Sequence, residues 1–197
     1  MNSLIAALTE KIHELEAELD AEIGKRRAEL RVGMERGRAV FEAEILRRHR
    51  ELKRALGAYI LNANPLAILT APVVYSVIVP LVLLDLFVSV YQAVCFPVYE
   101  IPKVRRGDYM VFDRGHLAYL NAVEKLNCAY CSYSNGLVAY VREIVARTEQ
   151  YWCPIKHARR VVGVHARYIN FDDYGDAENY QKRLQELRVS LRNEKQP

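Results

Sequence analysis

The uncharged stretch between Ala55 and Tyr99 constrains the folding of this chain more than any other feature. It carries one formal charge, Asp85, and its central part, residues 66–96, reads LAILTAPVVYSVIVPLVLLDLFVSVYQAVCF. A helix that crosses a bilayer needs about 20 apolar residues. A buried core helix of a soluble protein is the alternative, but the rest of the chain is too polar to enclose a run of this length. The stretch therefore predicts a membrane segment over residues 57–99, with membrane lipids as partners.

Basic residues flank both ends of the predicted membrane segment. They are Arg47, Arg48, Arg50, Lys53 and Arg54 before it, and Lys103, Arg105 and Arg106 after it. Positive residues collect on the cytoplasmic side of membranes, so both ends are expected in the cytoplasm, which requires a hairpin or re-entrant insertion. Pro72 and Pro80 could supply the bend. A single kinked span over about residues 66–90 is the alternative, because proline is tolerated in membrane helices.

Asp85 is the one ionisable group in the apolar run. Such groups are costly in hydrocarbon and usually face protein or water. One interpretation makes Asp85 a proton or cation site in a transport or channel component. We favour the interpretation in which it pairs between helices of an oligomer or lies near the interface, because one acid without a second polar group makes a poor pathway.

The first 56 residues carry an eleven-residue repeat of apolar positions, in alternating steps of four and seven. The positions are Leu8, Ile12, Leu19, Ile23, Leu30, Met34, Phe41, Ile45, Leu52 and Leu56. Eleven residues in three turns, about 3.67 per turn, favours a long helix with a weak right-handed supercoil. Gly24, Gly33 and Gly37 each lower helix stability by about 1 kcal/mol relative to alanine, but the segment has no proline. The repeat predicts a hendecad coiled-coil helix over residues 1–56.

A narrow apolar stripe on so long a helix needs a partner. We expect a homo-oligomer that forms through the N-terminal helix. Packing on the C-terminal part of the same chain and binding to a membrane surface are the alternatives, and the second would use the basic residues at 47–54.

Three of the four cysteines and one histidine have the spacing of a closed zinc site. Cys128 and Cys131 form a C-x2-C pair, and Cys153 and His157 form a C-x3-H pair. Four such ligands complete a tetrahedral zinc site and leave no open position, which indicates a structural rather than a catalytic metal. Iron or redox use of the cysteines, and buried thiols with an unconnected histidine, are the alternatives. His116 and His165 are possible substitutes for His157.

Residues 100–175 are expected to form a small helical zinc-binding domain. Apolar spacing predicts three short helices, with a turn at Asn135 and Gly136 and metal ligands at two corners, so that the metal would supply much of the folding energy. The basic residues between Lys156 and Arg167 are either a contact for lipid headgroups or a solvated face. Tyr180, Leu184, Leu187 and Leu191 predict a short amphipathic helix within a C-terminal segment over residues 176–197.

Composition and motifs limit the function. The net charge of +4 over 197 residues does not indicate a specific nucleic-acid binder. The sequence holds no glycine-rich phosphate loop, G-x-S-x-G elbow or H-E-x-x-H motif, so no catalytic residue is predicted. Thiolate ligands persist where thiols stay reduced, which places the C-terminal part in the cytoplasm.

The segment LNCAYCSYSNGLVAYVREIVARTEQYWCPIKHARR, residues 126–160, resembles an uncharacterised family of bacterial, mainly proteobacterial, membrane-associated proteins with a CxxC…WCPxKH signature. The resemblance covers about residues 66–175. It implies a bacterial origin and membrane association, and it implies no activity.

The sequence as a whole therefore predicts an all-α protein of the bacterial inner membrane, with its C-terminal domain in the cytoplasm. The expected function is that of a non-enzymatic, membrane-anchored oligomeric scaffold or adaptor with a structural zinc, which binds a protein partner. A membrane-associated redox or metal-dependent enzyme that uses the cysteine cluster, and a transport component built on Asp85, are the alternatives.

Overall fold

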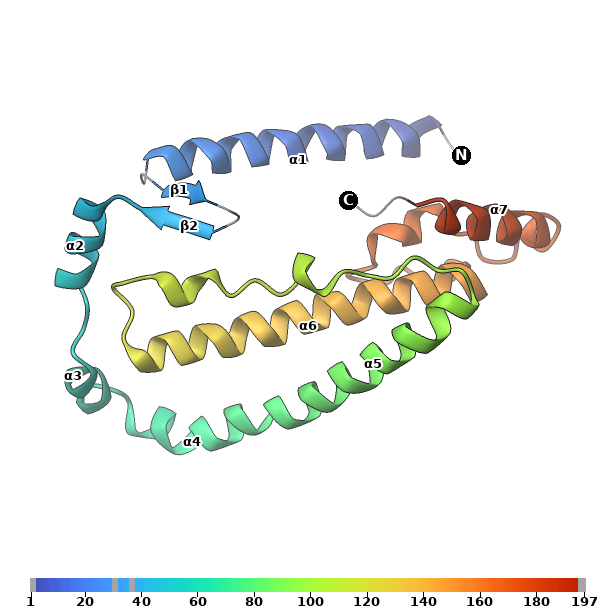
Figure 1. The fold of residues 1–197 in the computed structure, drawn as a ribbon. Coiled ribbons are helices and arrows are strands. Elements are labelled where there is room, and N and C mark those ends of the chain that lie inside the picture. The colour runs from blue at the N-terminus through green and yellow to red at the C-terminus, as the bar shows by residue number, and fades with distance from the viewer. Residues whose placement is uncertain (1–2, 30–31, 36–37, 195–197) are drawn as a thin grey trace. The chain divides into compact units, whose positions relative to one another are not determined.

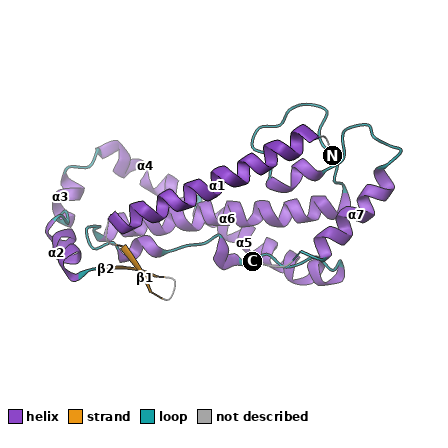
Figure 2. Cartoon of the chain, turned by 90° about the horizontal axis from the view of Figure 1, so that it is seen from above, coloured by secondary structure: helices purple, strands orange, loops and turns teal. Residues whose placement is uncertain are grey.

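The computed structural model describes residues 3–29, 32–35 and 38–194. The described chain is predominantly helical, which confirms the all-α prediction apart from one short hairpin (Figures 1 and 2). Two compact units are formed: unit 1 comprises residues 1–62 and 113–125, and unit 2 comprises residues 63–112 and 126–197. Unit 2 thus joins the apolar run and most of the later helices, which the sequence had predicted as separate domains.

Unit 1 begins with helix α1, Ser3–Glu29, followed by an antiparallel hairpin of β1, Val32–Glu35, and β2, Arg38–Phe41. Helices α2, Ala43–Glu51, and α3, Leu56–Leu61, follow. The unbroken helix predicted over residues 1–56 is therefore wrong, since α1 ends at Glu29 and Gly33 lies in a strand. Leu30 of the repeat lies outside the described residues. Glycine lowers helix stability and is tolerated in extended conformations, so Gly33 favours the strand β1, whereas Gly24 is accommodated within α1.

An aromatic row ties the two parts of unit 1 together. The ring of His49 in α2 lies 5.1 Å from the ring of Phe41 in β2 and 5.1 Å from that of Tyr119, both in edge-to-face geometry. Tyr119 follows the 3-10 helix η2, Asp113–His116. Residues 113–125 therefore belong to the N-terminal unit, although they are distant from it in sequence.

Unit 2 contains the apolar run as two consecutive helices, α4, Pro65–Ser76, and α5, Ile78–Val98. Asn64 starts α4, because its side chain accepts a hydrogen bond from the Leu66 amide at 2.9 Å and Pro65 fits the first helical position. Pro80 has no amide hydrogen to donate, and the helix is interrupted at Val77 without a reversal of the chain (Figure 1). The hairpin insertion predicted as one reading of this run is therefore not formed in the structure.

Helix α6, Ala122–Trp152, is the longest element of the described chain. A capping box starts it: the Asn121 side chain accepts from the Glu124 amide at 3.0 Å, and the Glu124 carboxylate accepts from the Asn121 amide at 2.8 Å. The helix passes straight through Asn135 and Gly136, where the sequence predicted a turn. The prediction of three short helices is therefore wrong.

Helices α5 and α6 lie side by side and run in the same direction. Asp85 contacts Tyr133, Gln92 contacts Tyr140, and Tyr99 at the end of α5 contacts Trp152 at the end of α6. The connecting segment, residues 99–112, runs back along α6, with the Pro102 carbonyl accepting from Arg147 and the Tyr109 carbonyl close to Gly136. It contains a 3-10 helix, η1, Arg106–Asp108.

The core of unit 2 lies between α5, α6, the connecting segment and the last helix, α7, Tyr180–Arg192. Its buried apolar members are Phe96, Ile101, Val104, Met110, Leu137, Tyr140, Ile144 and Leu191. The structure forms α7 within the predicted C-terminal segment and buries Leu184, Leu187 and Leu191. Gln150 of α6 donates to the Leu187 carbonyl at 3.0 Å, so α7 packs on the second half of α6.

Candidate functional site

The structure separates the four residues predicted to bind zinc. Cys128 and Cys131 lie one turn apart on α6, whereas Cys153 follows the last residue of the same helix. At 1.5 Å per residue, Cys128 and Cys153 are about 37 Å apart along the axis. Zinc–sulfur bonds measure about 2.3 Å, so one ion cannot bind both cysteines in this structure.

His157 lies beyond the helix and not one turn after Cys153 on it. Its amide donates to the Tyr168 hydroxyl at 2.6 Å, and its ring stacks on that of Tyr168. Of the two substitutes, His165 Nε2 lies 2.9 Å from a Glu149 carboxylate oxygen, and His116 lies in η2 of unit 1. Among the described residues, no three His, Cys, Asp or Glu side chains are grouped to hold a metal ion.

The cysteines are unpaired thiols within the described chain. Burial, followed by the nearby Glu149 carboxylate, raises the pKa of Cys153. The reactive and ligating form of cysteine is the thiolate, so these surroundings disfavour use of Cys153 as a nucleophile near neutral pH.

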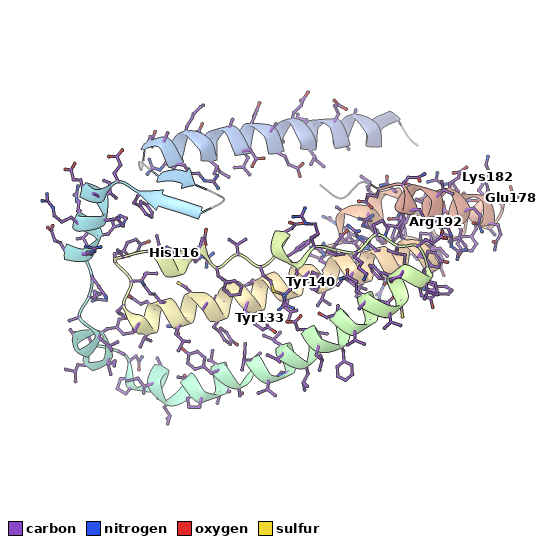
Figure 3. All side chains as sticks on the ribbon, viewed as in Figure 1. His116, Tyr133, Tyr140, Glu178, Lys182 and Arg192 are labelled. Atoms are coloured by element: carbon purple, nitrogen blue, oxygen red, sulfur yellow. The ribbon has the colours of Figure 1, made fainter. Side chains whose placement is uncertain are left out.

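A polar layer lies between α5, α6 and the connecting segment, and Asp85 is at its centre. The Arg106 guanidinium donates to the two carboxylate oxygens of Asp85 at 2.6 and 2.5 Å, and the Tyr133 hydroxyl donates at 2.9 Å (Figure 3 labels Tyr133 on α6). The hydrogen bonds from Arg106 to Asp85 raise the pKa of Arg106. Asp85 is thus paired inside its own chain, and no local pattern in the sequence identifies Arg106, 21 residues later, as its partner.

Gln92 extends this polar layer toward the end of α5. Its side-chain oxygen accepts from the Val104 amide at 2.6 Å, and its nitrogen donates to the Tyr140 hydroxyl at 2.8 Å (Figure 3). Tyr91 forms a hydrogen bond of 2.8 Å with Thr148. These contacts give α5 a fixed orientation on α6, because buried polar groups are satisfied in one register only.

A buried ionic cluster joins α6, α7 and the 3-10 helix η3, Ala166–Asn170. Glu143 accepts from Arg147 at 2.8 Å and from Arg167 at 2.6 Å, and Arg167 also pairs with Glu194 at 2.8 Å. Burial raises the pKa of Glu143, but the hydrogen bonds from Arg167 and Arg147 outweigh it and leave the pKa lowered. The cluster fixes the C-terminal part of unit 2, and both of its carboxylates, Glu143 and Glu194, are paired with arginines.

The outward side of α4 and α5 is apolar and uncovered. Pro65–Val98 is long and apolar enough to cross a membrane, and only 6% of its most apolar part is buried in the protein. Phe87, for example, is 70% exposed and Val98 72% exposed. Exposed apolar patches of this size mark a protein or membrane contact, so this surface is the candidate functional site.

A basic loop, residues 156–165, follows α6. The start of the loop is fixed to Asp172, because the Lys156 amide donates to the Asp172 carbonyl at 2.7 Å and the Asp172 amide donates to the Pro154 carbonyl at 2.9 Å. The loop lines an open cavity of about 470 Å³ with residues 156–164 and Tyr168. Arg159 and Arg160 make no ion pair with any residue that the structure describes, and Val162 is 92% exposed.

The sequence matches no protein-family model, no curated protein and no solved structure. The resemblance to a bacterial membrane-associated family therefore stays a prediction.

Proposed function

We propose that this chain is a non-enzymatic, membrane-anchored scaffold or adaptor. The observation that carries the proposal is the run Pro65–Val98. Most of its apolar side chains are left uncovered, whereas Asp85 and Gln92 are buried against α6 and the connecting segment. Contact with lipid removes such an apolar surface from water, whose exposure is unfavourable. The other elements of unit 2, α6, α7 and the connecting segment, are held to this run and to one another by the buried polar contacts described above.

The adaptor part of the proposal comes from α1. Leu8, Ile12, Leu15 and Leu19 are each more than half exposed and follow one another at helical spacing. We infer that this stripe associates with a second copy of the chain, so that the anchored modules are brought together, with a protein partner recruited to them. The location proposed is the bacterial inner membrane, with the C-terminal part in the cytoplasm, where free thiols persist.

The zinc ion is not carried into this proposal, because Cys128 lies near the start of α6 and Cys153 follows its end. The alternative functions also gain no support from the described residues. An enzyme that uses the cysteine cluster requires those thiols to lie together, and Cys128 and Cys153 do not. A transport site requires a polar group that can exchange its partners, whereas Asp85 is held by Arg106 and Tyr133.

Membrane fractionation tests the proposal directly. The full chain, expressed in a bacterium, is expected to sediment with the inner membrane, to resist extraction by high salt and alkaline carbonate, and to dissolve in mild detergent. Recovery of folded protein from the soluble fraction without detergent would overturn the membrane anchor. A monomer in detergent at micromolar concentration would overturn the oligomeric part alone.

A further inference from the structure

We propose that unit 2 attaches side-on to a single leaflet of an anionic bilayer and that the chain does not cross the membrane. The contact surface, called the lateral face, consists of Phe87, Val94 and Val98 of α5 and Val138, Val145 and Trp152 of α6, bordered by the basic loop. This inference rests on the proposed membrane function and specifies how the membrane is bound.

The first argument is the amount of charge beside α5. Helix α6 runs parallel to α5, since Asp85 contacts Tyr133 at one end and Tyr99 contacts Trp152 at the other. If α5 crossed the membrane along its normal, α6 and the connecting segment would enter the hydrocarbon with it. The exposed charged residues that would enter the hydrocarbon are Arg105, Arg106, Asp108 and Arg142. Each such residue costs about 2.5–3.5 kcal/mol at the centre of a membrane helix, and irregular backbone is not found exposed to lipid.

The second argument is that both helices present apolar rows on the same side. The hydrogen bond between Tyr91 and Thr148 marks the line along which α5 and α6 touch. Successive residues are rotated by about 100° around a helix axis. Around α5, Phe87, Val94 and Val98 therefore lie next to Tyr91, on the side turned away from Asp85 and Gln92.

The row on α6 has the corresponding position. Val138, Val145 and Trp152 recur every seven residues, so they share one side of the helix, just beyond Thr148 and away from Tyr133 and Tyr140. Val138 is 56% exposed and Trp152 is 49% exposed. The two rows therefore form one continuous apolar surface. The connecting segment bonds to Asp85 and Gln92, which lie on the opposite side of the helix pair.

The basic loop borders this surface on its α6 edge. Arg142 and Glu149 lie on the side of α6 next to the row of Val138, Val145 and Trp152, and they hold the loop beside that row. Arg142 donates to the carbonyls of Gly163 and Val164, and Glu149 pairs with His165. Gly163 has a φ of +71°, a conformation that glycine adopts without strain. The fixed loop presents Val162 for insertion beside the free guanidinium groups of Arg159 and Arg160, which suit anionic headgroups.

Side-on attachment also fits the flanking charges. Basic residues stand before and after the apolar run, and a single crossing would place one group on the wrong side of the membrane. Attachment to one leaflet keeps both groups, and both units, on the cytoplasmic side without a hairpin.

Trp152 makes the proposal testable in the unaltered chain, because it is the single tryptophan. In vesicles with anionic lipid, shallow and deep spin-labelled lipids report its depth. The variant V138W/W152F reports the depth of the α6 row 14 residues earlier, about 21 Å along the axis. Equal, shallow depths for the two probes are expected, and a difference close to 20 Å, or probes that lipid quenchers do not reach, would overturn the inference.

Topology gives an independent test. Protease-cleavable tags at the N- and C-terminus of the full chain are expected to be protected together in intact spheroplasts and cleaved together in inverted vesicles. Tags on opposite sides would overturn side-on attachment while leaving the membrane anchor in place, whereas a soluble protein would overturn the proposed function itself.

Variants test the loop and its charge. V145D and V162D are expected to weaken partition into anionic vesicles about tenfold each, and the double variant R159S/R160S about fivefold per arginine, with no effect on neutral vesicles. V189D, at an exposed position of α7 outside the lateral face, is the matched control. Unchanged partition for V145D and V162D would contradict the proposal, as would an equal loss for V189D.

Discussion

Asp85 shows how a charged residue is accommodated in an apolar helix of this protein. Its carboxylate is nearly covered, while Arg106 is half-exposed and approaches from the connecting segment. The two parallel hydrogen bonds between them form the strong, two-pronged geometry of a guanidinium–carboxylate pair. Asp85 therefore fixes the connecting segment against α5 and is a structural residue in this fold.

We predict that Asp85→Asn lowers the free energy of unfolding of unit 2 by about 1–3 kcal/mol, because the amide loses the charge-assisted bonds of a nearly buried group. Denaturant unfolding in mild detergent, followed by Trp152 fluorescence, measures the loss. Asp108→Asn is the control, since its contact with Arg105 is exposed and long at 3.8 Å. Equal stability for the two variants would assign Asp85 a role other than pairing with Arg106.

Gly136 is required by the close approach of the connecting segment to α6. A Cβ atom at this position would lie 2.6 Å from the Tyr109 carbonyl oxygen and 3.1 Å from the Met110 Cα, both backbone atoms that cannot rotate away. We predict that Gly136→Ala destabilises unit 2 by about 1–3 kcal/mol through overpacking, despite the higher helix propensity of alanine.

The control for Gly136 is Gly107→Ala, because a Cβ at Gly107 meets no atom within 4 Å. Its effect on the free energy of unfolding, measured by urea denaturation, is expected to stay within about 0.5 kcal/mol. If Gly136→Ala raised the free energy of unfolding, α6 and the connecting segment could not be packed as the structure places them.

Glu143 makes the stability of unit 2 depend on pH. Its pKa is lowered in the folded protein from an ordinary value of 4.5, because the hydrogen bonds from Arg167 and Arg147 outweigh the effect of burial. A group whose folded pKa is depressed stabilises the fold above its unfolded pKa and loses this contribution as the pH falls through the folded value. The stabilising contribution of Glu143 is therefore lost below pH 4.5.

We predict that the melting temperature falls as the pH drops below about 4.5, and that Glu143→Gln is less stable at pH 7 but shows a smaller acid-induced decrease. Circular dichroism melts between pH 3 and 7 measure both. Glu178→Gln, at an exposed carboxylate (Figure 3), should reproduce the wild-type profile. Parallel profiles for wild type and Glu143→Gln would contradict the role assigned to the cluster.

At the scale of elements, the sequence predicted well those features that depend on composition and failed on those that depend on packing. The helical run Pro65–Val98 follows from the absence of charge, and α7 follows from the spacing of three leucines. Helix α6 differs, because Asn135 and Gly136 favour a turn locally. In the structure the Asn135 side chain bonds back to the Cys131 carbonyl at 2.9 Å, and Gly136 is covered by the connecting segment. Tertiary contacts thus override the local preference.

For the same reason, the structure does not bring the four predicted zinc ligands together. A C-x2-C pair directs two thiolates to one point when it lies in a tight turn. Within the continuous helix α6, Cys128 and Cys131 are neighbours on one side of the helix, and the chain does not turn to bring further ligands to them. The second pair is divided by Pro154, since the residue before proline disfavours the helical conformation and α6 ends at Trp152. The spacing of the four residues is that of a zinc site, but whether they converge depends on the backbone conformation between them, which the spacing does not determine.

At the scale of the whole molecule, the course of α6 keeps the two predicted pairs of zinc ligands from sharing one ion. We predict that dialysis against a strong chelator leaves the melting temperature and the helical circular dichroism signal unchanged, because Cys128 and Cys153 are about 37 Å apart. Cys128→Ser and Cys153→Ser should behave as wild type. One tightly bound zinc per chain, together with a lower melting temperature after chelation, would contradict the course of α6.

Self-association through α1 is the remaining prediction for the whole molecule. Ile12 and Leu19 are 51% and 60% exposed on the apolar stripe of this helix. We predict that I12E/L19E shifts the full chain in detergent from an oligomer to a monomer, because two charges would be buried at the contact. Light scattering after size-exclusion chromatography measures the mass. The matched control is A17E/A28E, which adds the same two charges to exposed positions on the opposite side of α1. If both double variants kept the wild-type mass, the stripe would not be the contact, and if both dissociated, net charge rather than the stripe would explain the effect.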